Sequence, residues 1–297
     1  MDHPFTGLSV FPLTPTDSDG RVDETALTRI LERILTSGAA SIGLLGSTGI
    51  YAYLTADERR RAVEIAVSVV AGQMPLIVGC GAIRTDAAID LARHAEAAGA
   101  DALLMAPVSY TPLLEDEVAD HYAAVAGSTG LPMCLYNNPS TTHFTFSPAL
   151  LARIAAHPRI AGVKMPLPKG PISNDLPALR RALPRAFSIG YSADWGAGEA
   201  MLAGCDAFYS SVGGTIPDVM VKLAKAARRG DVEEVRRIDA ILAPLWKLCR
   251  EYGGLRISYA LARLLDLTDA APPLPLQTID GEAFARTEMA LTALDGI

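Results

Sequence analysis

The chain has 297 residues and a formal net charge of −7, and 50% of its residues are hydrophobic. This acidity argues against a nucleic-acid surface, since no basic stripe with interspersed aromatic residues occurs. Apolar runs are short and broken by glycine, proline or charge, well below the roughly 20 residues of a membrane span. The four cysteines and five histidines show neither disulfide nor metal-ligand spacing, so we expect reduced thiols, a cytoplasmic location and no metal site.

Strand-like and helix-like segments alternate from the start of the chain. Strands are expected at 7–11, 41–45, 76–79, 102–105, 133–136, 160–163, 186–189 and 207–210. The helices between and after them are expected at 24–36, 56–70, 86–97, 116–126, 148–156, 174–182, 196–203 and 217–229. Eight such units without a linker-rich break predict an α/β fold, a (β/α)8 TIM barrel over residues 1–230. An open doubly wound sheet is the alternative, but it would need a reversal of strand order and usually a GxGxxG turn.

Three helix ends in this region share one pattern, in which a glycine is followed within a few residues by a strand. Gly38, Gly99 and Gly204 are expected to adopt the left-handed conformation that ends a helix. Beyond Gly230 only helical patterns remain, at 232–249, 256–265 and 281–294. Residues 231–297 are therefore predicted to form a C-terminal helical extension.

The second strand ends in a turn that could bind an anion. Gly46–Gly49 reads Gly-Ser-Thr-Gly, and the next helix has its own capping box in Thr55 and Glu58. Ser47 and Thr48 are then free to offer hydroxyls and backbone N–H groups to a small carboxylate. In that helix the basic run 59–61 is flanked by acidic residues, which favours a solvated face with intrahelical ion pairs.

Two strand ends carry side chains that could react together. Lys164 follows the apolar segment 160–163, and a lysine in an apolar cavity can lose its proton and attack a carbonyl. The plain alternative is a strand-end lysine that reaches solvent. Tyr136 ends the preceding strand before an Asn-Asn-Pro turn, and a phenol can relay protons. Tyr110, in the loop after the fourth strand, is a further candidate for that relay.

Together these motifs resemble the dihydrodipicolinate synthase / N-acetylneuraminate lyase family. The markers are Gly-Ser-Thr-Gly at Gly46, Tyr-Asn-x-Pro at Tyr136 and Gly-Val-Lys ending at Lys164, with 164 − 136 = 28 residues between the last two. The resemblance covers essentially the whole chain. It implies a barrel enzyme that forms a Schiff base with pyruvate or another 2-keto acid, without a metal or nucleotide cofactor.

The resemblance also implies residue roles. Lys164 would be the Schiff-base lysine and Tyr136 the proton relay, with Thr48 and Tyr110 as further catalytic residues. The residues implied in substrate binding are Ser47, Thr48, Thr141, Gly190, Tyr209 (through its backbone carbonyl) and Ser211. Family members commonly assemble as homodimers or homotetramers in which a tyrosine crosses into the neighbouring site, and Tyr110 is the nearest candidate.

The sequence departs from the family pattern where the second substrate binds. Thr141 stands where dihydrodipicolinate synthases carry an arginine that grips a carboxylate, and Ser192-Ala193 stand where sialic-acid lyases carry an acidic pair. We therefore expect a Schiff-base lyase of the aldolase or synthase type that acts on pyruvate or a related 2-keto acid. Aldol addition to an aldehyde, retro-aldol cleavage and loss of water could each follow from the enamine. The alternatives are a 2-keto-3-deoxy sugar-acid aldolase or dehydratase, a keto-acid-binding barrel without turnover, and a phosphate-binding barrel that uses the turn at 213–215.

Overall fold

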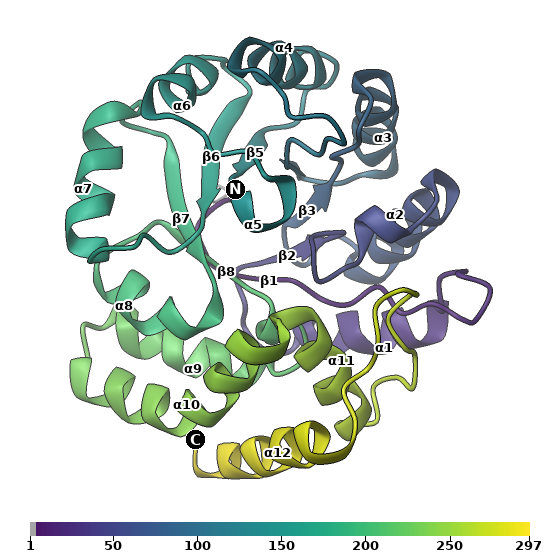
Figure 1. Cartoon of the computed structure of the whole chain (residues 1–297), viewed down its shortest axis with the longest axis vertical. Helices are drawn as coiled ribbons and strands as arrows, with labels where there is room; N and C mark the ends of the chain where they lie inside the picture. The colour runs from purple at the N-terminus through teal and green to yellow at the C-terminus, as the bar shows by residue number, and fades with distance from the viewer. Residues whose placement is uncertain (1–3) are drawn as a thin grey trace.

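The computed structural model of the chain describes residues 4–297 and contains a closed barrel of parallel strands (Figure 1). Neighbouring strands follow the order β1 to β8, and β8 pairs with β1 to close the ring. The helices surround the strands on the outside. The predicted (β/α)8 barrel is confirmed, and the doubly wound alternative is wrong because the sheet has no free edge.

The element bounds follow the sequence pattern closely. The strands are β1 Gly7–Val10, β2 Ser41–Leu44, β3 Leu76–Gly79, β4 Ala102–Met105, β5 Met133–Tyr136, β6 Ile160–Met165, β7 Ser188–Ser192 and β8 Ala207–Ser210. The helices of the barrel are α1 Glu24–Leu35, α2 Ala56–Val70, α3 Thr85–Ala98, α4 Glu115–Ala126, α5 Pro139–Thr142, α6 Pro148–Ala155, α7 Ile172–Ala182, α8 Ala197–Leu202 and α9 Pro217–Arg228. Short 3₁₀ turns are η1 Tyr51–Tyr53, η2 Asp194–Gly196, η3 Val212–Gly214 and η4 Ala293–Gly296.

Alternation along the strands divides the apolar side chains into two layers. In β5, Cys134 and Tyr136 belong to a cluster inside the barrel, whereas Met133 and Leu135 pack outward against the helices. Successive side chains of a strand point to opposite faces, so this parity also turns Val163 outward and Lys164 inward. The interior is therefore filled by side chains, and the lysine lies among them.

Glycine conformation at the ends of barrel helices agrees with the sequence. Gly38, Gly99 and Gly204 have φ values of 85°, 108° and 85°, in the left-handed region that glycine adopts at low cost. The capping box of α2 is only half formed. The Thr55 hydroxyl accepts from the Glu58 N–H, but the Glu58 carboxylate binds the N–H of Val22.

The C-terminal helices pack against the barrel rather than standing apart. They are α10 Val232–Tyr252, α11 Gly254–Leu264 and α12 Gly281–Thr292, which lie together along one side of the molecule in Figure 1. α10 contacts α8 and α9, and the apolar residues of these helices belong to the same core cluster as the outer face of the barrel. The division of the chain at residue 230 stays a prediction. Within residues 4–297, no helix is long and apolar enough to cross a membrane.

Two strands differ from the prediction where the site is built. β6 continues to Met165, so Lys164 lies inside the strand and not after it. β7 begins at Ser188 and ends at Ser192, later than the predicted 186–189. In both cases polar or glycine residues extend a strand because the closed ring provides pairing partners that a local pattern does not reveal. The turn after β5 also forms the short helix α5, which was not predicted.

Candidate active site

Lys164 lies at the carboxyl end of the barrel and is almost completely buried. Its backbone is in register with Tyr136 of β5 and Gly190 of β7, and the side chain is 4% exposed. The Nζ atom lies 3.7 Å from the ring centre of Phe11, 4.3 Å from that of Tyr136 and 5.5 Å from that of Tyr209. The alternative of a solvent-reaching lysine is wrong, because aromatic rings enclose the amine.

No acidic side chain in residues 4–297 forms an ion pair with this amine. Lysine is rarely buried unless it is paired, so a buried and unpaired lysine is a candidate functional group. An uncharged amine in such a place is a nucleophile toward a carbonyl carbon.

The hydroxyl of Tyr136 lies between two polar side chains. The Asn138 amide nitrogen donates to it at 3.0 Å, and the Ser47 hydroxyl lies 3.4 Å away. Asn138 was not singled out from the sequence, because it sits in a turn where asparagine is common. Thr48 is buried beside Ser47, but the contact with the phenol comes from Ser47. Lys164, Tyr136 and Ser47 thus converge at one end of the barrel.

The absence of a side chain at Gly190 leaves space for the ring of Tyr209, which forms part of the wall around Lys164. A Cβ atom there would lie 2.5 Å from Cε2 of Tyr209 and 2.7 Å from the backbone oxygen of Ala207. The Tyr209 hydroxyl lies 3.4 Å from the Cys134 sulfur, so its ring points into the barrel beside Lys164. Tyr209 therefore contributes its side chain to the wall, in addition to the backbone carbonyl considered from sequence.

A buried carboxyl at the start of η2 was missed by the sequence analysis. Asp194 accepts hydrogen bonds from the Ser210 hydroxyl and from the backbone N–H groups of Ser211 and Val212. Burial raises the pKa of Asp194, and these hydrogen bonds oppose that rise. Asp194 fixes the turn after β8, and no sequence pattern distinguishes it from a surface aspartate.

Three of the expected site residues lie apart from this cluster in a single chain. Tyr110 is 94% exposed, so it does not join the phenol relay within one protomer. Thr141 is exposed on α5, where its hydroxyl donates to the backbone oxygen of Asn138. Ser211 uses its backbone N–H to hold Asp194.

Arg59 contradicts the expectation of a solvated basic run. It is 5% exposed, and its guanidinium donates to the backbone oxygens of Gly79 and Gly81 at 2.9 and 3.0 Å while it stacks on the ring of Tyr51. Burial lowers the pKa of Arg59 and raises that of Tyr51. Arg59 is buried because of its position on the helix. It continues the buried stripe of α2, which is formed by Ala62, Val63, Ala66 and Val70.

Replacing Arg59 is expected to destabilise the fold. In Arg59→Met the two glycine carbonyls lose their donors, and we expect the free energy of unfolding to fall by about 2–4 kcal/mol. Urea denaturation would measure this. Arg60→Met is the matched control, because Arg60 pairs with exposed Asp57, and a loss within about 1 kcal/mol is expected there. Equal effects of the two substitutions would contradict a structural role for Arg59.

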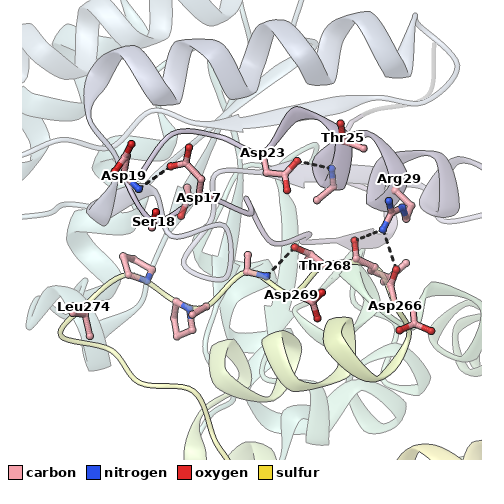
Figure 2. A pocket seen from close by; sticks show the side chains of 18 residues that line it. Asp17, Ser18, Asp19, Asp23, Thr25, Arg29, Asp266, Thr268, Asp269 and Leu274 are labelled. Atoms are coloured by element: carbon pink, nitrogen blue, oxygen red, sulfur yellow. Dashed lines mark hydrogen bonds between the residues drawn. The ribbon is translucent and has the colours of Figure 1, made fainter.

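The space at the site is small, and a larger groove lies elsewhere. A cavity of about 10 Å³ is lined by Tyr136 and Tyr51 together with Leu45, Gly46, Gly79, Gly81, Leu104 and Ala106. A groove of about 970 Å³ lies between residues 266–274 on one side and the loop after β1 with the start of α1 on the other, and no strand residue lines it. Figure 2 shows its lining side chains. The smaller cavity adjoins Tyr136 and the turn after β2, whereas Lys164, Tyr136 and Ser47 are all absent from the lining of the larger groove. Residues 4–297 hold no cluster of three or more side chains suited to a metal ion.

Comparison with known proteins identifies the family. A sequence profile described as the Dihydrodipicolinate synthetase family matches residues 4–294. A 4-hydroxy-tetrahydrodipicolinate synthase of Acidiphilium cryptum is 34% identical over 301 residues, which cover 98% of each chain. The crystal structure of a dihydrodipicolinate synthase from Agrobacterium tumefaciens is 50% identical with a TM-score of 0.96, covering 98% of each chain. A chloride-inhibited dihydrodipicolinate synthase of Acinetobacter baumannii, complexed with pyruvate, is 28% identical with a TM-score of 0.88 and covers 99% of this chain and 100% of that one.

These relatives match along nearly the whole chain and are named as synthases. They confirm the family and the enzyme class expected from the sequence. They do not favour the sugar-acid alternative, the barrel without turnover or the phosphate-binding barrel. The chain belongs to the dihydrodipicolinate synthetase family and is a Schiff-base-forming lyase of that family.

Proposed function

We propose that the Lys164 amine attacks the keto carbon of pyruvate or a related 2-keto acid. Loss of water then gives an imine, and the protonated imine withdraws electrons from the neighbouring C–H bond so that an enamine forms. The enamine carbon adds to an aldehyde, and water releases the product from the lysine. The single observation that carries this proposal is the buried, unpaired position of Lys164 beside the Tyr136 phenol.

The turn after β2 supports a place for the keto-acid carboxylate. In the described part of the chain, the backbone N–H groups of Ser47 and Thr48 form no hydrogen bond. Successive free amides in a turn suit a carboxylate. The Ser47 hydroxyl also lies 3.4 Å from that of Tyr136. We therefore assign the hydroxyl link to Ser47 and carboxylate binding to the amides of Ser47 and Thr48.

The walls of the site are proposed from the strands that flank Lys164. Gly190 and Tyr209 form the side toward β7 and β8, and Ser211 directly follows the last residue of β8 in the chain. Thr141 cannot replace a bidentate arginine, since it has one hydroxyl and no positive charge. We propose an aldehyde as second substrate that is not held by a cation at position 141.

Proton exchange at the pyruvate methyl group tests the proposed function. Enamine formation removes a methyl proton, so in deuterated water the protein is expected to replace the methyl protons of pyruvate with deuterium. Proton NMR would follow the loss of the methyl signal, with Lys169→Met, at an exposed lysine, as a control that keeps exchange. If the protein accelerated the exchange of protons for deuterium in neither pyruvate nor 2-oxobutyrate, compared with buffer alone, the proposed function would be wrong.

We propose that the chain acts as a homodimer or homotetramer. Ile83, Tyr110 and Leu114 are 67%, 94% and 69% exposed, and they lie in the loops that follow the adjacent strands β3 and β4. Exposed large apolar side chains close together are typical of an interface. In such an assembly Tyr110 would be covered by a partner and would lie near that partner's site.

Sedimentation velocity tests this assembly. The double change Tyr110→Ser with Leu114→Ser is expected to shift the protein toward the monomer, because two of the three exposed apolar side chains of the proposed interface are lost. Leu274→Ser is the control, since Leu274 is 84% exposed in a different segment. A monomeric unmodified protein at micromolar concentration would contradict the proposal.

We further propose that the reaction needs no metal or nucleotide and takes place in the cytoplasm. The protonated imine itself withdraws electrons from the substrate carbon. In other enzymes that stabilise a carbanion, a bound cofactor accepts these electrons. Cys80, Cys134, Cys205 and Cys249 are unpaired, as expected in a reducing compartment. Full turnover after dialysis against EDTA would support the proposal, and restoration of lost activity by a metal would contradict it.

A further inference from the structure

Asn138 follows Tyr136 by two residues, and its side chain has one partner at each end. The amide nitrogen donates to the Tyr136 hydroxyl at 3.0 Å, and the amide oxygen accepts from the Ser140 hydroxyl at 2.8 Å. Both partners are close in the chain, since Tyr136 ends β5 and Ser140 lies in α5, which begins directly after Asn138. The amide is thus held in one orientation against the phenol.

Helix capping does not account for this side chain. Asn138 precedes α5, but its side chain makes no capping hydrogen bond. The start of α5 is held by the backbone oxygen of Asn138, which accepts from the N–H groups of Thr141 and Thr142 and from both of their hydroxyls. A change of the side chain would leave these backbone contacts in place.

The contact restricts what the phenol can do with its proton. An amide nitrogen is a donor only, so the Tyr136 oxygen accepts from Asn138 and its own proton points elsewhere. The hydroxyl proton of Tyr136 can then point toward the Ser47 hydroxyl, whose oxygen lies 3.4 Å from that of Tyr136, or toward the space beside Lys164. When the phenol gives its proton away, the same amide donates to a negatively charged oxygen, and such hydrogen bonds are stronger than neutral ones.

We propose that Asn138 is a positioning residue, which directs the proton of Tyr136 toward Ser47 and the bound keto acid and stabilises the phenolate. This inference rests on the proposed function. Asn138 itself exchanges no proton, and Ser140 acts one contact further out by orienting the amide. Several titratable side chains lie near Tyr136: Lys164 from β6 lies over its ring, Tyr51 from η1 lines the same cavity, and Cys134 of β5 and Tyr209 of β8 belong to the same interior cluster.

Four variants test the proposal: Asn138→Ala, Asn138→Asp, Ser140→Ala and the control Asn174→Asp, which makes the same chemical change at an exposed position on α7. Pyruvate methyl exchange gives kcat and KM over a range of pH. For Asn138→Ala we expect kcat to fall roughly 10- to 100-fold, as for one hydrogen bond to a charged oxygen, with KM within about 2-fold. For Asn138→Asp we expect a larger fall in kcat, which should grow as the pH rises and the introduced carboxyl group loses its proton, because a carboxylate opposes the negative charge that develops on the Tyr136 oxygen.

Ser140→Ala keeps the proposal testable if the Asn138 variants do not fold, because Ser140 is exposed and its loss only frees the amide. A smaller fall in kcat, about 2- to 10-fold, is expected there. Borohydride trapping of pyruvate separates this inference from the proposed function: the variants should still form the adduct at Lys164, only more slowly. Unchanged kcat and pH profile in folded Asn138→Ala and Ser140→Ala would overturn the role of Asn138. Absence of an adduct in the unmodified protein would instead overturn the proposed function, and this role with it.

Discussion

Lys164→Met should abolish turnover while leaving the protein folded. Methionine has a similar length and no nucleophilic nitrogen, so the imine cannot form, and we expect kcat/KM to fall by roughly 10⁴-fold or more. The fold should tolerate the change because an apolar side chain replaces an unpaired buried lysine, and the melting temperature is expected to stay equal or rise. The measurements are pyruvate-dependent turnover and thermal unfolding on the same preparations.

Lys169→Met provides the matched control for this result. Lys169 lies five residues further on and is exposed, so the same substitution should leave both activity and stability unchanged. Residual activity of Lys164→Met within about 10-fold of the unmodified protein would contradict covalent catalysis by this residue, since a fall that small matches the loss of one hydrogen bond.

Tyr136→Phe should slow the reaction strongly and keep the aromatic wall. The ring next to Lys164 remains, but the hydroxyl that contacts Asn138 and Ser47 is lost. General acid–base groups contribute about 10² to 10⁴-fold, so we expect kcat to fall by that amount while the KM for pyruvate changes little. Steady-state kinetics of turnover and of methyl exchange would both measure the effect.

Tyr53→Phe is the control for the loss of a phenol hydroxyl. Tyr53 is 47% exposed on η1, away from the interior cluster, and its change should leave kcat unaltered. A Tyr136→Phe protein with normal kcat would mean that another group or water moves the protons, and the assignment of Tyr136 would then be wrong.

Most of the fold could be predicted because it depends on local pattern. β3, β4, β5 and β8 have the bounds expected from their apolar runs, and the left-handed glycines after α1, α3 and α8 mark the return to the next strand. β6 and β7 were misplaced because their ends contain lysine, glycine and serine. Those residues pair only when neighbouring strands are already in place, which a single segment cannot reveal.

The site was predictable only in part. Lys164 and Tyr136 stand out because their types are unusual at strand ends, and strand parity then points both of them inward. Asn138 and Asp194 look like ordinary turn residues, and only their partners distinguish them. Arg59 was misassigned because acidic residues flank the basic run 59–61 within α2, although its own helical position matches the buried stripe.

Borohydride reduction in the presence of pyruvate tests the central claim most directly. Reduction converts an imine into a stable amine, so peptide mapping by mass spectrometry should find one reduced pyruvyl group on the peptide that contains Lys164. The same treatment of Lys164→Met should leave every peptide unmodified. An unmodified Lys164 peptide in the active protein, or an adduct on another lysine, would contradict the account.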